Sequence, residues 1–169
     1  MTADAADYDV ASFDLSTPIA GIDDIRAVNP HRFEFEMLTA VVLMDPDRKL
    51  VVGYKDLGPD EFWARGHMPG YPLMPGVLMV EAAAQLCCYF STALRVSSPG
   101  TLMGLGGIEE TKFVRPVRPG DRLVLVGTGM KVHRRLTRFR TVGYVRNEKV
   151  FEATVVGVPI GKLEELKGA

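Results

Sequence analysis

The strongest pattern in the chain is an apolar run over residues 77–94, VLMVEAAAQLCCYFSTAL, which follows Pro75. Alanine and leucine favour helices, and a proline is tolerated in the first helical turn. The run therefore predicts one long helix. Because apolar residues occupy nearly every side of it, we expect the rest of the chain to wrap around this helix.

The same run must be tested as a membrane span. At about 1.5 Å per residue it would be roughly 27 Å long, close to the thickness of a bilayer core. Polar residues lie near both of its ends: Glu81, Gln85, Ser91 and Thr92. We therefore expect no insertion into a membrane and interpret the run as the core helix of a globular domain.

Stretches rich in valine, leucine, threonine and aromatic residues predict strands on both sides of the helix. The clearest are residues 36–44, 49–55, 122–132, 136–146 and 149–158. The turns between them are short and polar, which makes sequential strands antiparallel neighbours. The expected fold class is α+β, with a curved antiparallel sheet of five or six strands around one long central helix.

Length and composition are those of one globular domain. The 169 residues are 47% hydrophobic and 24% charged, and a chain of this size can form a core without disulfides or a structural metal. Residues 1–28 hold six aspartates and few large apolar side chains, so we interpret them as an acidic N-terminal extension and residues 29–169 as the packed domain. The start, MTADAADYDV, lacks the features of a signal peptide, which favours a cytoplasmic location.

Charge is unevenly distributed, although the net charge is only −1. Residues 111–140 contain nine lysines and arginines against Asp121 alone. Such a block would attract an acidic partner, unless it is only the solvated face of a strand. No helix-turn-helix, zinc-finger or RNA-binding motif accompanies it, so we expect no nucleic-acid partner.

We expect neither a metal nor a cofactor. The histidines, His31, His67 and His133, are far apart in the sequence, and no cysteine and histidine have ligand spacing. The adjacent Cys87 and Cys88 lie within the apolar run and are interpreted as small hydrophobic residues. The glycines of MGLGG do not open a helix after a strand, so they do not form a nucleotide-binding fingerprint.

The candidate chemistry lies in HMPGYPLMPGVLMVEAAAQ, residues 67–85. A lone histidine in a turn, such as His67, is more often structural than catalytic. Glu81 changes that balance, because an isolated carboxylate among aliphatic residues is costly unless it is paired or protonated. The amides of Gly76 and Val77 open the helix and could polarise a carbonyl oxygen. A base, an acid and an oxyanion donor predict proton abstraction beside a carbonyl, with a leaving group expelled one carbon further away.

Three segments carry a family resemblance. GHMPGYPLMPGVLMVEAAAQ resembles the signature of the β-hydroxyacyl-acyl carrier protein dehydratases of bacterial-type fatty acid synthesis, the FabZ-like enzymes. Pro30-His31-Arg32 is similar to the family's opening Pro-His-Arg, and GIEETKFVRPVRPGDRL, residues 107–123, is similar to its Gly-Ile-x-x-x-Lys-Phe-x-x-Pro-Val-x-Pro-Gly-Asp-x-Leu segment. The matching motifs span residues 30–125.

The resemblance implies a hotdog fold and a homodimer that can assemble further as a trimer of dimers. In such a dimer the loop histidine of one subunit faces the helix glutamate of the other. His67 is then the base that takes the α-proton, and Glu81 is the acid that expels the β-hydroxyl as water. The Gly76 amide would hold the thioester oxygen, and Gln85 would either hold the carboxyl of Glu81 or satisfy buried backbone groups.

The partner that the resemblance implies is an acyl carrier protein loaded with a 3-hydroxyacyl chain. Such carriers are acidic and dock at a basic rim, for which Lys112, Arg115 and Arg118 are the candidates. The alternative is that these three residues pair with nearby carboxylates and position the loop.

The chain departs from the family at two places. Met68 stands where phenylalanine is usual, and Glu34, Glu36 and Thr39 make the first predicted strand atypical. Three other functions compete with dehydration: an isomerising dehydratase, a hotdog acyl thioesterase and a non-catalytic acyl-binding module. The isomerising relatives carry aspartate in place of Glu81, MPGVL favours dehydration over thioester hydrolysis, and both members of the acid–base pair are present.

Overall fold

The computed structural model describes residues 7–166 and is built around one long helix, α2 (Gly76–Ala93). The helix begins and ends one residue before the predicted range. Its first hydrogen bond runs from the amide of Leu78 to the carbonyl of Pro75, at 2.9 Å. By length and composition it could span a membrane, but more than half of it is buried within the protein, as expected for a core helix.

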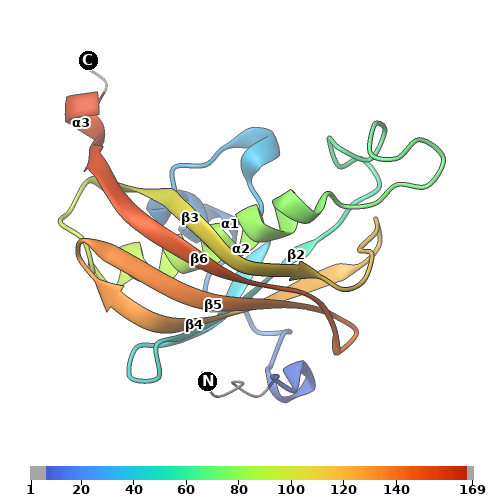
Figure 1. Cartoon of the computed structure of the whole chain (residues 1–169), viewed down its shortest axis with the longest axis horizontal. Coiled ribbons are helices and arrows are strands. Elements are labelled where there is room, and N and C mark those ends of the chain that lie inside the picture. The colour runs from blue at the N-terminus through green and yellow to red at the C-terminus, as the bar shows by residue number, and fades with distance from the viewer. Residues whose placement is uncertain (1–6, 167–169) are drawn as a thin grey trace.

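Six strands form one antiparallel sheet that curves around α2 (Figure 1). The strands are β1 (Ala40–Asp45), β2 (Leu50–Asp56), β3 (Thr101–Phe113), β4 (Arg122–His133), β5 (Leu136–Val145) and β6 (Glu148–Lys162). Their order in the sheet is β1-β2-β4-β5-β6-β3, so β3 forms one edge. The predicted α+β architecture is confirmed.

Alternating side chains divide the sheet into two buried faces. Leu123 and Leu125 of β4 point toward α2 and join its core, whereas Val124 and Val126 point away and join a second cluster. This alternation explains why β4 is apolar at the consecutive positions 123–126. Both faces of the sheet are covered where β1, β2, β4 and β5 carry the second cluster, and the site lies on the helix side.

The second face is covered by part of the N-terminal segment. Val10 is buried there, and Tyr8 donates through its backbone amide to the hydroxyl of Tyr144 at 2.9 Å. Further along, Ala20 and Ile25 contribute to the core around α2; Ile25 belongs to α1 (Ile22–Val28). Parts of the acidic N-terminal extension therefore pack on the domain, while residues 1–6 lie outside the described part of the chain.

Two strands differ from the sequence-based expectation. β1 begins at Ala40 rather than residue 36, because Phe33–Phe35 form a 3-10 turn and the following residues bond elsewhere. β3 had no predicted bounds, since glycines interrupt its pattern. At Gly104 a β-carbon would come within 2.5 Å of the Ile160 side chain of β6, so a glycine there lets the two strands pack closely.

Candidate active site

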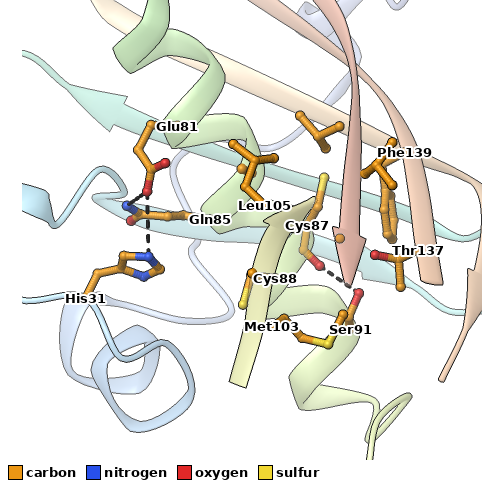
Figure 2. A pocket seen from close by; sticks show the side chains of 15 residues that line it. His31, Glu81, Gln85, Cys87, Cys88, Ser91, Met103, Leu105, Thr137 and Phe139 are labelled. Atoms are coloured by element: carbon orange, nitrogen blue, oxygen red, sulfur yellow. Dashed lines mark hydrogen bonds and ion pairs between the residues drawn. The ribbon is translucent and has the colours of Figure 1, made fainter. Parts of the chain in front are cut away.

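Glu81 lies at one end of a cavity of about 180 Å³ between α2 and the strands β3, β5 and β6 (Figure 2). The second turn of α2 carries the residue, and its side chain is 24% exposed. The rest of the cavity is lined mainly by apolar or small side chains, among them Cys87, Leu105, Phe139 and Val155. The cavity therefore combines one carboxyl group with an apolar interior, which suits an acyl chain.

Gln85 holds this carboxyl group from the next turn of the same helix. Its amide nitrogen donates to Glu81 Oε1 at 2.7 Å and to the carbonyl of Phe35 at 2.9 Å. Its amide oxygen accepts from the Met37 amide at 3.1 Å. Gln85 thus orients the carboxyl group and also satisfies buried backbone groups, so the two alternatives for this residue occur together.

His31 is a further member of the cavity. Its Nε2 lies 3.6 Å from Glu81 Oε1, and its side chain is 28% exposed. Burial lowers the pKa of His31 below the usual value of histidine; the Glu81 carboxyl opposes this shift, and Arg32 reinforces it. His31 is therefore mostly uncharged at neutral pH.

His67 is half-buried in the loop that precedes α2. Its Nδ1 lies 2.9 Å from the carbonyl of Leu73, and the Leu73 amide donates back to the His67 carbonyl at 2.9 Å. A carbonyl oxygen can only accept, so this contact places the ring proton on Nδ1. Nε2 is left with a free lone pair, which is the state that a general base needs.

Within one chain, His67 and Glu81 do not share the cavity. The residues that line it do not include His67, and the polar contacts of the Glu81 carboxyl among residues 7–166 are with Gln85 and His31. The loop that carries His67 extends beyond the start of α2 (Figure 1). The cavity of a single chain therefore contains Glu81 without His67.

The other predicted site residues, Gly76 and Val77, lie at the start of α2. Gly76 and Val77 precede the first helical hydrogen bond, and amides at this position have no partner inside a helix. Val77 is 71% exposed. A β-carbon on Gly76 would come within 2.8 Å of the Phe113 ring, so this glycine is also required for packing against the end of β3.

The three predicted docking residues are exposed, and each has a partner. Lys112 lies 3.5 Å from Glu152, and Arg115 lies 3.7 Å from Glu148. The Arg118 guanidinium stacks 3.8 Å from the centre of the Tyr71 ring, in the loop that carries His67. Exposed pairs of this kind are weak. Lys112 and Arg115 thus form the carboxylate pairs of the alternative interpretation, and docking of a partner stays a prediction.

The described residues offer no obvious metal site. Within residues 7–166, no group of three or more histidine, cysteine, aspartate or glutamate side chains is arranged to hold a metal ion. Cys88 lines the cavity, but burial raises the pKa of its thiol and keeps the thiol uncharged at neutral pH.

Sequence reasoning missed His31 as a member of the site. Its only signal is the Pro30-His31-Arg32 motif, which carries the resemblance without revealing what the histidine contacts. The chain separates His31 from Glu81 by fifty positions, so only the fold brings the two together.

Comparisons with known proteins find relatives over most of the chain. A family model described as a FabA-like domain matches residues 29–154. The 3-hydroxyacyl-acyl-carrier-protein dehydratase FabZ of Escherichia coli is 38% identical over 136 residues, which cover 80% of this chain and 89% of the relative. FabZ of Salmonella arizonae matches to the same extent. The resemblance stated from the motifs is confirmed.

Solved structures support the fold. The dehydratase heterocomplex ApeI:P of Xenorhabdus doucetiae superposes with a TM-score of 0.69 at 15% identity, covering 85% of this chain and 95% of that one. A hypothetical thioesterase of Streptococcus pneumoniae with coenzyme A superposes with a TM-score of 0.59 at 13% identity, covering 84% and 98%. These similarities confirm the hotdog fold.

Proposed function

The chain belongs to the FabA-like family, and we propose that it is a 3-hydroxyacyl-acyl carrier protein dehydratase of fatty acid biosynthesis. It converts (3R)-3-hydroxyacyl thioesters to trans-2-enoyl thioesters and water. The observation that carries the proposal is the Glu81 carboxyl group, which Gln85 holds by a 2.7 Å hydrogen bond at one end of an otherwise largely apolar cavity. A cytoplasmic location and independence of any cofactor complete the proposal.

His67 and Glu81 divide the proton transfers of this reaction. The unprotonated Nε2 of His67 takes the α-proton, and the electrons of the broken C–H bond form the C=C bond. The C–O bond to the β-hydroxyl breaks, and Glu81 donates the proton with which the hydroxyl leaves as water. The amides of Gly76 and Val77 donate hydrogen bonds to the thioester oxygen and stabilise the negative charge that develops on it. Transfer of the proton from His67 back to Glu81 through solvent completes the cycle.

A homodimer would bring the two groups together. β3 is an edge strand of thirteen residues whose backbone can pair with a second copy. Large apolar side chains on and just after this edge are exposed: Leu105, Ile108, Phe113 and Val114. Because Leu105 also lines the cavity of Glu81, pairing along β3 would place the partner subunit beside the acid. Assembly into a trimer of dimers belongs to the same proposal.

An assay of enoyl-thioester hydration tests the activity directly. Purified protein should add water to a trans-2-enoyl thioester, seen as loss of absorbance of the conjugated thioester, and should produce the (3R)-alcohol. Hydrolysis of the thioester instead would identify an acyl thioesterase. No turnover on either carrier-protein or coenzyme A substrates would indicate an acyl-binding module.

Carrier-protein docking is proposed at Lys112, Arg115 and Arg118. Lys112 lies near the end of β3, and Arg115 and Arg118 lie in the connection from β3 to β4, at the end of the sheet near the start of α2 (Figure 1). Replacing both Arg115 and Arg118 by glutamate should raise KM for carrier-protein substrates by about tenfold, because charges at an interface rim guide an oppositely charged partner. The effect should shrink as salt screens the charges.

The β4–β5 turn at the opposite end of the sheet supplies the matched control. Replacing Arg134 and Arg135, which are both exposed there, by glutamate makes the same change in net charge. This variant should keep the wild-type KM. Arg118 contacts Tyr71 in the loop that carries His67, so damage to this loop would also impair turnover of coenzyme A substrates. If KM rises as much for coenzyme A substrates as for carrier-protein substrates, the two arginines position the loop and do not dock the carrier.

A further inference from the structure

His31 is the one titratable side chain of the cavity that the proposed reaction does not use and that faces the acid directly. Its Nε2 lies 3.6 Å from Glu81 Oε1 (Figure 2). That separation is slightly too long for a hydrogen bond, and a small rotation of either side chain would make one. The same oxygen accepts the 2.7 Å hydrogen bond from Gln85.

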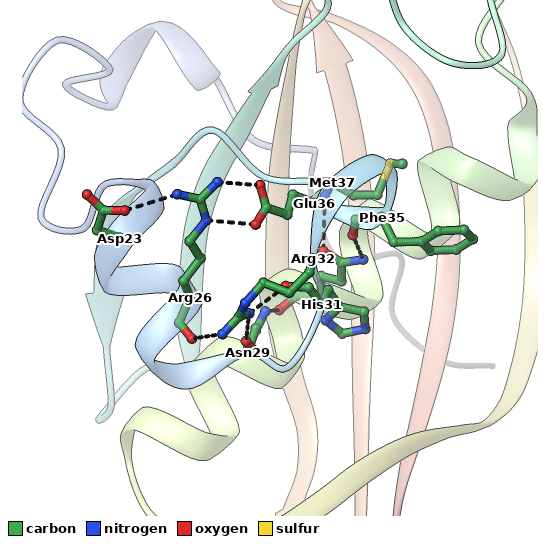
Figure 3. A network of polar contacts seen from close by, with 9 residues as sticks. Asp23, Arg26, Asn29, His31, Arg32, Phe35, Glu36 and Met37 are labelled. Atoms are coloured by element: carbon green, nitrogen blue, oxygen red, sulfur yellow. Dashed lines mark hydrogen bonds and ion pairs between the residues drawn. The ribbon is translucent and has the colours of Figure 1, made fainter.

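A polar network fixes the segment that carries His31 (Figure 3). The Arg32 guanidinium donates to the carbonyls of Arg26, Asn29 and His31 at 2.6–2.9 Å. The Asn29 amide donates to the Gln85 carbonyl at 2.9 Å, which joins the segment to α2. These bonds determine where the imidazole lies, so its approach to Glu81 is a feature of the fold.

The tautomer of His31 follows from its surroundings. Nδ1 is buried and has no hydrogen-bond partner among the described residues. A buried N–H without an acceptor would be costly, whereas Nε2 has a carboxyl oxygen in front of it. The proton of the neutral ring therefore belongs on Nε2 and points toward Glu81.

We propose that His31 is a positioning residue for Glu81: its Nε2–H and the Gln85 amide both donate to Oε1, so the acidic proton resides on Oε2 and faces the substrate. This inference rests on the proposed dehydratase function. It gives the histidine of the Pro30-His31-Arg32 motif a role in the reaction without contact with the substrate.

Two substitutions separate positioning from packing. In His31→Gln the side-chain amide can still donate near the position of Nε2, but it does not titrate. His31→Leu keeps a similar volume and donates nothing. We expect His31→Leu to lower kcat by about tenfold with KM changed less than about threefold, and His31→Gln to keep kcat within about threefold of wild type, as for a hydrogen bond that orients a catalytic acid.

A second variant without a donor keeps the test decisive. His31→Met also fills a similar volume and donates nothing, so it should lower kcat as His31→Leu does and decides the matter if His31→Leu fails to fold. His133→Leu, at an exposed turn outside the cavity, is the control and should behave as wild type.

Specific results would overturn the inference. A folded His31→Leu or His31→Met enzyme with wild-type kcat would show that His31 does not act on Glu81. Equal loss of kcat in His31→Gln and His31→Leu would assign it a packing role only. Each of these outcomes requires an active wild-type enzyme, so a failure of the proposed function, in which wild type itself is inactive, is recognised separately.

Discussion

Replacing His67 by alanine, or Glu81 by glutamine, is expected to lower the dehydratase kcat by about 10²- to 10⁴-fold, the usual contribution of a positioned base or acid. His67→Ala removes the lone pair of Nε2 that takes the α-proton. Glu81→Gln retains an oxygen that accepts from Gln85 but has no acidic proton to give. The rate of enoyl-thioester hydration, measured with saturating substrate, checks both expectations.

The folds of both variants should survive. The ring of His67 bonds to a single backbone carbonyl, and glutamine nearly matches glutamate in shape. Thermal unfolding and gel filtration compared with wild type provide the control. Met68→Leu, in the same loop as His67 and exposed to solvent, should remain active and shows that the loop tolerates substitution. Activity within about threefold of wild type in a folded variant would remove that residue from the mechanism.

The local part of the fold was predictable from the sequence because it depends on short-range patterns. The apolar run gave α2 to within one residue, and the β-branched stretches gave β2 and β4 to β6 approximately. The sequence pattern did not predict β3, because its glycines and exposed residues suit an edge strand and do not form a repeating pattern. Its packing against β6, for example Gly104 against Ile160, depends on partners far along the chain.

The predicted start of the first strand was wrong for a related reason. Glu36 does not belong to a strand, because its carboxylate forms a bidentate pair with Arg26 at 2.7 and 2.9 Å. Thr39 accepts from the Asp56 amide at 2.9 Å and so anchors the approach to β1. These two departures from the family pattern therefore have structural roles, and both depend on contacts that local composition does not reveal.

In the candidate site, too, contacts between residues close in the sequence were predictable and contacts between distant residues were not. Glu81 and Gln85 are one helical turn apart, so their contact follows from helix geometry alone. The contact between His31 and Glu81 joins residues fifty positions apart and requires the fold. The cavity of one chain holds Glu81 but not His67, and the pairing of the two residues across subunits stays a prediction from the resemblance to a family of dimers.

That relation can be tested by mixing two inactive variants. If each site combines His67 of one subunit with Glu81 of the other, a mixed dimer of His67→Ala and Glu81→Gln has one site with both residues intact and one with neither. Equal amounts exchanged at random give mixed dimers in half of the population. Since each has one intact site of two, activity should return to about one quarter of wild type.

Subunit exchange must be demonstrated before activity is compared. Differently tagged variants, incubated together under conditions that dissociate the dimer and then returned to assay conditions, allow the mixed dimer to be isolated through both tags. The isolated mixed dimer should have about half of wild-type activity, because one of its two sites is complete. Each variant carried alone through the same procedure gives the background activity. If isolated mixed dimers stay as inactive as either parent, His67 and Glu81 act within one chain, and the exposed edge of β3 needs another explanation.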